Sequence, residues 1–385
     1  MKKILYIALI LIFGSSIYAV PPASAETAGI TARVCILDGE KSVKIELDSP
    51  YKMYSMDSDK VVMEGPYLKA KVTPNVSGLV VNKKVIRAGS VRIDVAKDSN
   101  IYIDGKRFRG EVDIARKDKN SLLVINHIPV ETYLYGVLYN EVSHRWPMEV
   151  LKAQAIVART FAYYQIEQNK KRLYDLRSDI YSQVYSGKTS EKWATTMAVK
   201  LTKDKVLAYN GRILPSYYHA TCAGYTEDAS NLWAVDIPPL DGVKCGYCDN
   251  SPHISWRCEV PLWDLETKLR ENGYKIGRIV SIKPVSVNKS GRNEKLEIKD
   301  KDGISIIITA KDFRNVIGPN KLKSTKFGVS IRWGYLIMHG WGWGHGAGMC
   351  QWGAYQMAKD KKTCEQILSY YYPGSEIVKI EEIKI

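Results

Sequence analysis

The spacing of apolar residues changes near residue 127, and this change constrains the fold more than any other feature of the sequence. The segment "VRIDVAKDSNIYIDGKRFRGEVDIARKDKNSLLVIN" alternates apolar and polar residues and contains the hairpin signal Asp104-Gly105, a pattern typical of β-strands. From Pro129 the apolar residues recur with helical spacing. We therefore expect an α+β fold of mixed helices and β-sheets. A β-rich N-terminal region over 26–126 would precede a mixed region over 127–385.

The first 25 residues have the features of a secretory signal peptide. Lys2 and Lys3 precede the apolar run 4–20, and Ala23-Ser24-Ala25 is a small-residue cleavage signature. We expect cleavage after Ala25 and a location outside the cytoplasm, either secreted or in the cell envelope. The alternative is an uncleaved membrane anchor, but the unbroken apolar core is short for a bilayer. Contact with the membrane is expected only through this segment.

The charge of the chain favours an acidic partner. Lysine and arginine number 56 against 41 aspartates and glutamates, giving a formal net charge of +15 that is spread along the chain. For an exported protein this predicts binding to anionic wall polymers or lipid headgroups, and no nucleic acid is expected as a partner. The alternative is a solvated basic surface without a specific partner.

A glutamate stands at the expected end of the first helix. In "VETYLYGVLYNE" the apolar residues Leu134, Val137 and Leu138 share one helical face, and Glu141 falls on that same face. Partial desolvation there would raise the pKa of the carboxyl group, as a general acid near neutral pH requires. The alternative is a helix-end glutamate that turns to water or is paired with Arg145.

A second helix is predicted from Pro147, because proline is favoured at the first helical position. Lys152 and Arg159 are seven residues apart and so project from nearly the same side. They could bind an anionic substrate or steady the carboxylate of Glu141. The alternative is two solvated basic residues. The predicted buried stripe of this helix consists of Val150, Ala153, Val157 and Phe161.

Histidines and cysteines gather between residues 219 and 258. Two spacings, His219-x2-Cys222 and Cys245-x2-Cys248, suit a closed tetrahedral zinc site of structural rather than catalytic role. The expected ligands are Cys222, Cys245 and Cys248, with His253, or else His219, as the fourth. Disulfides among these cysteines and Cys258 are the alternative in an oxidising compartment. All seven cysteines follow the signal segment, so pairing alone would leave one free.

A glycine-rich stretch, "HGWGWGHGAGMCQWGAYQMAKDK", covers residues 339–361. Its glycines allow close approach of the backbone to a ligand, and its tryptophans offer stacking faces. His345 lies among residues too small to bury it, which favours a binding role. The alternative is a structural turn with packing tryptophans.

Several motifs together resemble the SpoIID/LytB family, the stage II sporulation protein D group. They are "PVETYLYGVLYNEVSHRWPMEVLKAQAIVARTFA", "SQVYSGKTSE", "YYHATCAGYTEDASNLW", "GWGHGAGMCQWGAYQMA" and "ILSYYYPG", in family order from about residue 128 to 374. The β-rich N-terminal region matches only loosely. In the last long motif Cys350 replaces the usual serine, and Val142-Ser143 replaces the usual turn after the glutamate.

The resemblance implies a cell-wall lytic transglycosylase. Such enzymes cut peptidoglycan glycan strands between N-acetylmuramic acid and N-acetylglucosamine, leave 1,6-anhydro ends, and prefer strands that a partner amidase has stripped of stem peptides. The family's catalytic glutamate falls on Glu141, and its basic helix residues fall on Lys152 and Arg159. We expect the glycan groove to be shaped or bound by Lys152, Arg159, Gln183, Tyr185, His219 and His345.

One carboxyl group would suffice for this chemistry, acting first as acid and then as base, and no cofactor is required for catalysis. Ordinary glycosidases instead use a pair of carboxylates. Nothing in the sequence places Glu149, Glu191 or Glu227 beside Glu141 as such a partner. The rival function is a non-catalytic peptidoglycan-binding enhancer of an N-acetylmuramoyl-L-alanine amidase, as LytB-type members have been described.

Overall fold

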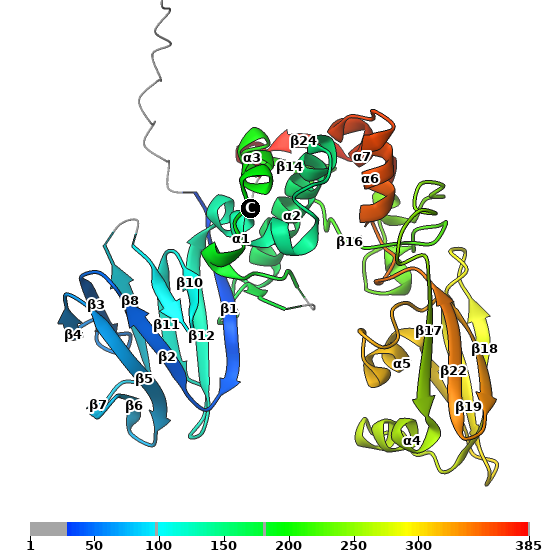
Figure 1. The fold of residues 1–385 in the computed structure, drawn as a ribbon, viewed down its shortest axis with the longest axis horizontal. Coiled ribbons are helices and arrows are strands. Elements are labelled where there is room, and N and C mark those ends of the chain that lie inside the picture. Colours follow the sequence, from blue (N-terminus) through cyan, green and yellow to red (C-terminus); the bar gives the residue numbers. More distant parts are fainter. Residues whose placement is uncertain (1–28, 97–98, 180–181, 384–385) are drawn as a thin grey trace, which may run out of the picture.

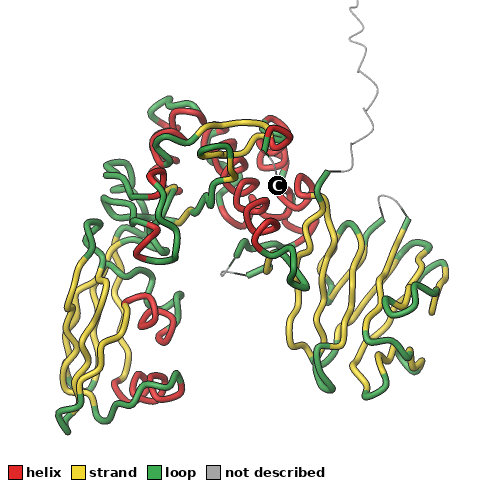
Figure 2. The backbone as a smooth tube through the Cα atoms, turned by 180° about the vertical axis from the view of Figure 1, so that it is seen from behind, coloured by secondary structure: helices red, strands yellow, loops and turns green. Residues whose placement is uncertain are grey.

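The computed structural model describes residues 29–96, 99–179 and 182–383, so the predicted signal peptide lies outside the described residues. The α+β fold class is confirmed. Two β-rich lobes lie on either side of a mainly helical middle (Figures 1 and 2). Within the described ranges, no helix is both long and apolar enough to cross a membrane.

The N-terminal lobe consists of two sheets that share one hydrophobic core. Strict alternation of buried and exposed residues, as in "VKIEL" of β2, gives each sheet one face toward this core. The first sheet has the order β13-β1-β12-β11-β8-β3-β4, and the second has the order β10-β9-β2-β5-β6-β7. The strands are β1 (Thr31–Glu40), β2 (Val43–Leu47), β3 (Tyr51–Ser55), β4 (Val61–Gly65), β5 (Leu68–Asn75), β6 (Gly78–Val81), β7 (Lys84–Ile86), β8 (Ser90–Val95), β9 (Ile101–Ile103), β10 (Lys106–Phe108), β11 (Glu111–Arg116), β12 (Leu122–Pro129) and β13 (Leu176–Arg177).

The lobe continues directly into the helical middle. The expected boundary between residues 126 and 127 falls inside β12, which pairs with β1 on one side and β11 on the other. Because the interior of this strand is buried on both faces, it shows no alternation that would mark its end. Helix α1 starts at the residue after β12, so the sheet fixes the start of α1.

The middle is built around α2, a helix with buried residues on nearly every side. The predicted helix pair is confirmed: α1 ends at Glu141, and α2 follows Pro147. Strand β24 pairs with β14, and β16 pairs with β23 in parallel, so residues beyond 349 complete this region. Its elements are α1 (Val130–Glu141), α2 (Met148–Gln168), α3 (Trp193–Leu201), β14 (Lys205–Tyr209), β15 (Arg212–Ile213), β16 (Tyr218–His219), β23 (Met349–Cys350), α6 (Gln351–Lys359), α7 (Cys364–Tyr371) and β24 (Glu376–Lys379).

The second β-rich lobe lies between β16 and β23 in the sequence and has a hydrophobic core of its own. The sequence "ISIIITAKDFRNVIG" was predicted to be a strand followed by a helix, and it forms β20 and α5. This separate core was not anticipated for the mixed region 127–385. Its elements are β17 (Ser255–Pro261), α4 (Leu262–Glu271), β18 (Ile279–Val287), β19 (Asn293–Asp300), β20 (Ser305–Thr309), α5 (Ala310–Ile317), β21 (Phe327–Arg332) and β22 (Tyr335–Trp341).

Candidate active site

The carboxyl group of Glu141 lies at the end of α1 in a partly desolvated position. The side chain is half-buried. Its Oε1 accepts a hydrogen bond of 3.1 Å from the backbone N–H of Val184, and it also accepts one from the Tyr218 hydroxyl. Burial raises the pKa of the Glu141 carboxyl to about 7, against the lowering effect of these two hydrogen bonds. The carboxyl group is therefore close to half-protonated at neutral pH.

The segment that carries Val184 is held against α1 by close backbone packing. A Cβ atom at Gly136 would lie 2.6 Å from the Tyr185 ring and 2.8 Å from the Gly187 carbonyl oxygen, so only glycine allows this approach. The Asn140 side chain donates hydrogen bonds to the carbonyls of Gly136 and Val184. The position of the Val184 N–H beside Glu141 follows from these contacts.

Tyr218 is oriented by a buried chain of hydrogen bonds. Gln183 Nε2 donates to the Tyr218 hydroxyl at 3.2 Å and to the carbonyl of Ala158, while its Oε1 accepts from Tyr133. The Tyr218 hydroxyl therefore accepts from Gln183 and donates to Glu141. Gln183 was expected to bind substrate, but its side chain is fully buried and instead supports Tyr218.

Gln351, at the start of α6, contacts the Glu141 site although it lies far from Glu141 in the sequence. Its Nε2 donates to the backbone carbonyl of Glu141 at 3.2 Å and to Gln154 Oε1 at 3.3 Å. These contacts fix the end of α1 against α2 and α6. The backbone at Glu141 is thus held in place by residues 210 positions later in the chain.

The structure places Arg159 away from Glu141. Its side chain is 0% exposed, and it forms an ion pair with Glu131 while donating to the carbonyls of Val199 and Lys205. Glu131 lies ten residues before Glu141 on α1, which corresponds to about 15 Å along the helix axis. The expected groove role is therefore not supported by this geometry, since Arg159 joins α1, α2 and α3.

Lys152 and Tyr185 also have structural partners. Lys152 forms an ion pair with Glu149 at 2.7 Å, and Glu149 in turn accepts from the backbone N–H of Cys364 in α7. Tyr185 is buried, and its hydroxyl donates to Asn126. Neither side chain shares a hydrogen bond with Glu141 in the described part of the chain.

His219 and His345 form a separate pair. Their ring centroids are 5.7 Å apart, and both rings contact the backbone of Ala347. Burial lowers the pKa of His345 to about 3 and that of His219 well below its ordinary value, so both rings are neutral. Tyr218 and His219 are neighbours on β16, and successive strand residues point to opposite faces. The His219 side chain therefore points away from the face on which Tyr218 meets Glu141, whereas the His345 ring makes a hydrogen bond with the backbone of Tyr218.

Four thiols converge next to the histidine pair. The Sγ atoms of Cys222, Cys245, Cys248 and Cys350 all lie within 4.8 Å of one another, and such a group could hold a metal ion. The fourth member is thus Cys350, and not His253 or His219 as expected. His253 instead packs edge-on against Trp343, with 4.6 Å between ring centroids. Cys258 belongs to the core of the second β-rich lobe.

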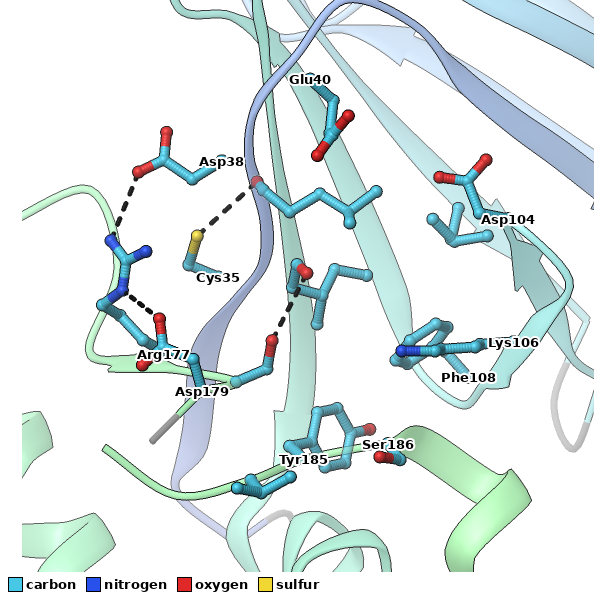
Figure 3. A pocket seen from close by; sticks show the side chains of 15 residues that line it. Cys35, Asp38, Glu40, Asp104, Lys106, Phe108, Arg177, Asp179, Tyr185 and Ser186 are labelled. Atoms are coloured by element: carbon cyan, nitrogen blue, oxygen red, sulfur yellow. Dashed lines mark hydrogen bonds and ion pairs between the residues drawn. The ribbon is translucent and has the colours of Figure 1, made fainter. Parts of the chain in front are cut away.

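A pocket of about 360 Å³ lies beside the segment 184–186 (Figure 3). Val184 and Tyr185 line it on one side, and β1, β9 and β10 contribute most of the rest. Arg177 bridges Asp38 and Asp179 at its rim. Glu141 is not among the lining residues, but the backbone N–H of Val184 connects the pocket wall to its carboxyl group.

Comparison with known proteins identifies the family. A sequence model described as stage II sporulation protein (SpoIID) matches residues 118–209. The stage II sporulation protein D of Bacillus subtilis is 30% identical over 270 residues, which cover 66% of this chain and 75% of that protein. The chain belongs to the SpoIID family.

Other relatives extend the SpoIID match. An uncharacterized protein of Brachyspira hyodysenteriae is 32% identical over 353 residues, covering 91% of this chain and 94% of that protein. The amidase enhancer of Bacillus subtilis is 28% identical over 327 residues, or 72% of this chain and 45% of that protein. A domain of unknown function (DUF8618) matches residues 248–348, which correspond to the second β-rich lobe.

Sequence reasoning on this SpoIID-family chain missed Tyr218, Gln351 and Cys350 as site residues. Tyr218 directly precedes the selected His219, and Gln351 follows Cys350 in the glycine-rich stretch. Both residues lie within the quoted family motifs, and this membership is the sequence feature that could have identified them. The cysteine at 350, in place of the family's usual serine, is visible in the sequence, but its link to the other cysteines depends on the pairing of β16 with β23.

Proposed function

We propose that this protein is an exported lytic transglycosylase that cleaves the glycan strands of peptidoglycan in the cell wall. The observation that carries the proposal is the carboxyl group of Glu141, which is partly desolvated and has a pKa of about 7. A general acid must hold its proton near the working pH and then be able to accept one back. Membership of the SpoIID family supports a role at the cell wall.

In the proposed reaction Glu141 donates its proton to the glycosidic oxygen that links N-acetylmuramic acid to N-acetylglucosamine. The bond from the anomeric carbon to this oxygen breaks as the leaving sugar takes the proton. The 6-hydroxyl of the muramic acid then attacks the anomeric carbon, and Glu141 accepts the proton that it loses. The products are a 1,6-anhydro end and a free hydroxyl, with no water consumed.

The surroundings of Glu141 suit a mechanism with one carboxyl group. Among the described residues, its hydrogen-bond donors are the Val184 N–H and the Tyr218 hydroxyl, and no carboxylate joins them. Glu191 is paired with Arg109, and Glu227 accepts hydrogen bonds from Ser290 and Asn288. A hydrolase would need a second carboxylate to activate water.

The test is digestion of purified glycan strands without stem peptides, followed by mass spectrometry of the fragments. Wild type should release anhydro-ended fragments, and Glu141→Gln should release none. Glu365→Gln is the matched control, because this carboxylate is exposed on α7. Fragments heavier by one water would contradict transglycosylation and indicate hydrolysis.

Similarity to the amidase enhancer of Bacillus subtilis favours a second candidate function. In this reading the protein binds peptidoglycan and stimulates an N-acetylmuramoyl-L-alanine amidase without cleaving glycan. The two functions separate in one assay of amidase activity on intact sacculi with added protein. Equal stimulation by wild type and Glu141→Gln, with no anhydro product from either, would establish the enhancer and exclude the enzyme.

A further inference from the structure

We infer that Cys222, Cys245, Cys248 and Cys350 bind one zinc ion as four thiolates. Their side chains are 0%, 1%, 1% and 0% exposed, and their sulfur atoms all lie within 4.8 Å of one another. Zinc–sulfur bonds of about 2.3 Å in a tetrahedron place the sulfurs about 3.8 Å apart. The Sγ atoms of Cys222 and Cys248 are 3.5 Å apart, close to that spacing.

The backbone around the sulfurs has the form of a thiolate site. The backbone N–H of Cys222 points to Cys350 Sγ at 3.3 Å, and that of Gly224 points to Cys248. The turn that follows Cys222 has positive φ at Ala223 and Gly224, which aims these donors inward. Cys245-x2-Cys248 supplies the remaining pair with the spacing of a zinc knuckle.

A buried arginine next to the cluster supports a net negative charge there. Four thiolates and one Zn²⁺ carry a charge of −2. The guanidinium of Arg292 is 0% exposed, donates to the Cys222 carbonyl at 3.1 Å, and interacts electrostatically with Cys222, Cys248 and Cys350. Within the described ranges its Nε and Nη1 have no hydrogen-bond acceptor.

The other charges near Arg292 fit this account. Glu227 interacts with it but is already satisfied by four donors, from Asp228, Asn231, Asn288 and Ser290. Lys326 adds a second cation on the same side and donates to the Ala223 carbonyl at 2.9 Å. Arg292 is fully buried and Lys326 is half-buried. A buried guanidinium beside neutral thiols would be costly, and an anionic metal cluster offsets that cost.

The metal would position the strands that complete the Glu141 site. Cys222 lies four residues after Tyr218, which donates to Glu141, and Cys350 directly precedes Gln351, which holds the Glu141 carbonyl. Strands β16 and β23 pair Tyr218 with Met349 and His219 with Cys350. A zinc ion joining Cys222 to Cys350 therefore ties together the two segments that reach α1, while Cys245 and Cys248 anchor a third loop.

The first test is metal analysis of the full chain purified under reducing conditions. We expect one zinc per chain by mass spectrometry of the elements, released when a mercurial reagent blocks the thiols. Replacement by Co²⁺ should give the absorption bands of a tetrahedral four-thiolate site. Absence of stoichiometric metal, iron in place of zinc, or disulfides among these four cysteines in non-reduced peptides would each overturn the inference.

Variants identify the fourth ligand. Cys350→Ser should lower zinc content well below one per chain, whereas His253→Ala and the buried-cysteine control Cys364→Ser should retain it. If Cys350→Ser fails to fold, the His253→Ala protein and the cobalt spectrum of wild type still decide the ligand set. Loss of zinc from His253→Ala with retention in Cys350→Ser would overturn the assignment.

Discussion

The carboxyl group of Glu141 gives the protein a pH dependence with a defined sign. Its pKa of about 7 means that the acid form is present below neutral pH and is lost above it. We expect kcat/KM for glycan cleavage to fall about tenfold per pH unit above an apparent pKa near 7, because the first step needs the proton. Rates measured from pH 5 to pH 9 check this. A rate that stays constant up to pH 9 would rule out Glu141 as the acid.

The same pKa shift affects stability. The pKa of Glu141 is about 7 in the folded state against an ordinary value of 4.5, so the folded state disfavours ionisation. The stability linked to this group is full below pH 4.5 and is lost as pH rises through 7, by roughly 3 kcal/mol in all. Glu141→Gln cannot ionise, so its stability relative to wild type should rise by that amount between about pH 4.5 and about pH 8.5.

Urea unfolding of both proteins at the two pH values measures this difference. Glu365→Gln replaces an exposed carboxylate, so its stability relative to wild type should hardly change between the two pH values. A stability difference between Glu141→Gln and wild type that does not depend on pH would show that the carboxyl is not desolvated. Gain of stability with loss of activity would be typical of a functional residue held in an unfavourable environment.

The sequence alone identifies some residues of the candidate site and not others. Glu141 could be selected because its position relative to Leu134 and Val137 is a local, helical property. Tyr218 and Gln351 contact it across 77 and 210 positions, and no local pattern encodes such contacts. Arg159 was assigned from its spacing to Lys152, but spacing gives the helix face and not the neighbour that covers it.

Among the elements, α1 and α3 are joined to α2 through Arg159. The guanidinium makes an ion pair with Glu131 and three further hydrogen bonds, to Thr202 and to the carbonyls of Val199 and Lys205. Arg159→Ala should lower the free energy of unfolding by about 3 to 5 kcal/mol, because it leaves buried acceptors and one carboxylate unpaired.

Lys152→Ala on the same helix is the matched control. Lys152 and Glu149 are both partly exposed, so losing this pair should cost less than about 1 kcal/mol. Urea unfolding of the two variants at neutral pH makes the comparison. Equal destabilisation would contradict the structural role of Arg159 and reopen a role in binding.

The helices themselves were predictable because α1 and α2 carry clear helical spacing and a proline just before each start. The end of the β-rich region was harder to predict from the sequence. Strand β12 is buried on both sides and continues to Pro129, where the alternation used to place the boundary no longer applies.

For the whole molecule, the net charge of +15 predicts salt-dependent attachment to anionic wall polymers. Screening shortens from about 10 Å to about 3 Å between about 0.1 M and about 1 M salt. Cosedimentation of Glu141→Gln with sacculi should therefore weaken strongly over this range, and more so when the sacculi retain their anionic polymers. Binding that is independent of salt would indicate recognition of neutral sugars alone.

The separate core of the second β-rich lobe was not predicted. Its strands and helices have readable patterns, as "ISIIITAKDFRNVIG" shows, but a pattern of elements does not reveal which core they join. Only the pairing of β16 with β23 shows that this lobe is an insertion into the middle region.

The reach of Gln351 back to Glu141 has a consequence for the order of assembly. A chain that leaves a ribosome or a secretion channel with its N-terminal end first presents residue 141 long before residue 351. Until then β16 lacks its neighbouring strand, and the Glu141 carbonyl lacks its Gln351 partner. A carboxyl group in such an unfinished site stays hydrated and ionised at neutral pH. Under the proposed function, glycan cleavage would therefore begin only after residue 351 has reached the Glu141 site.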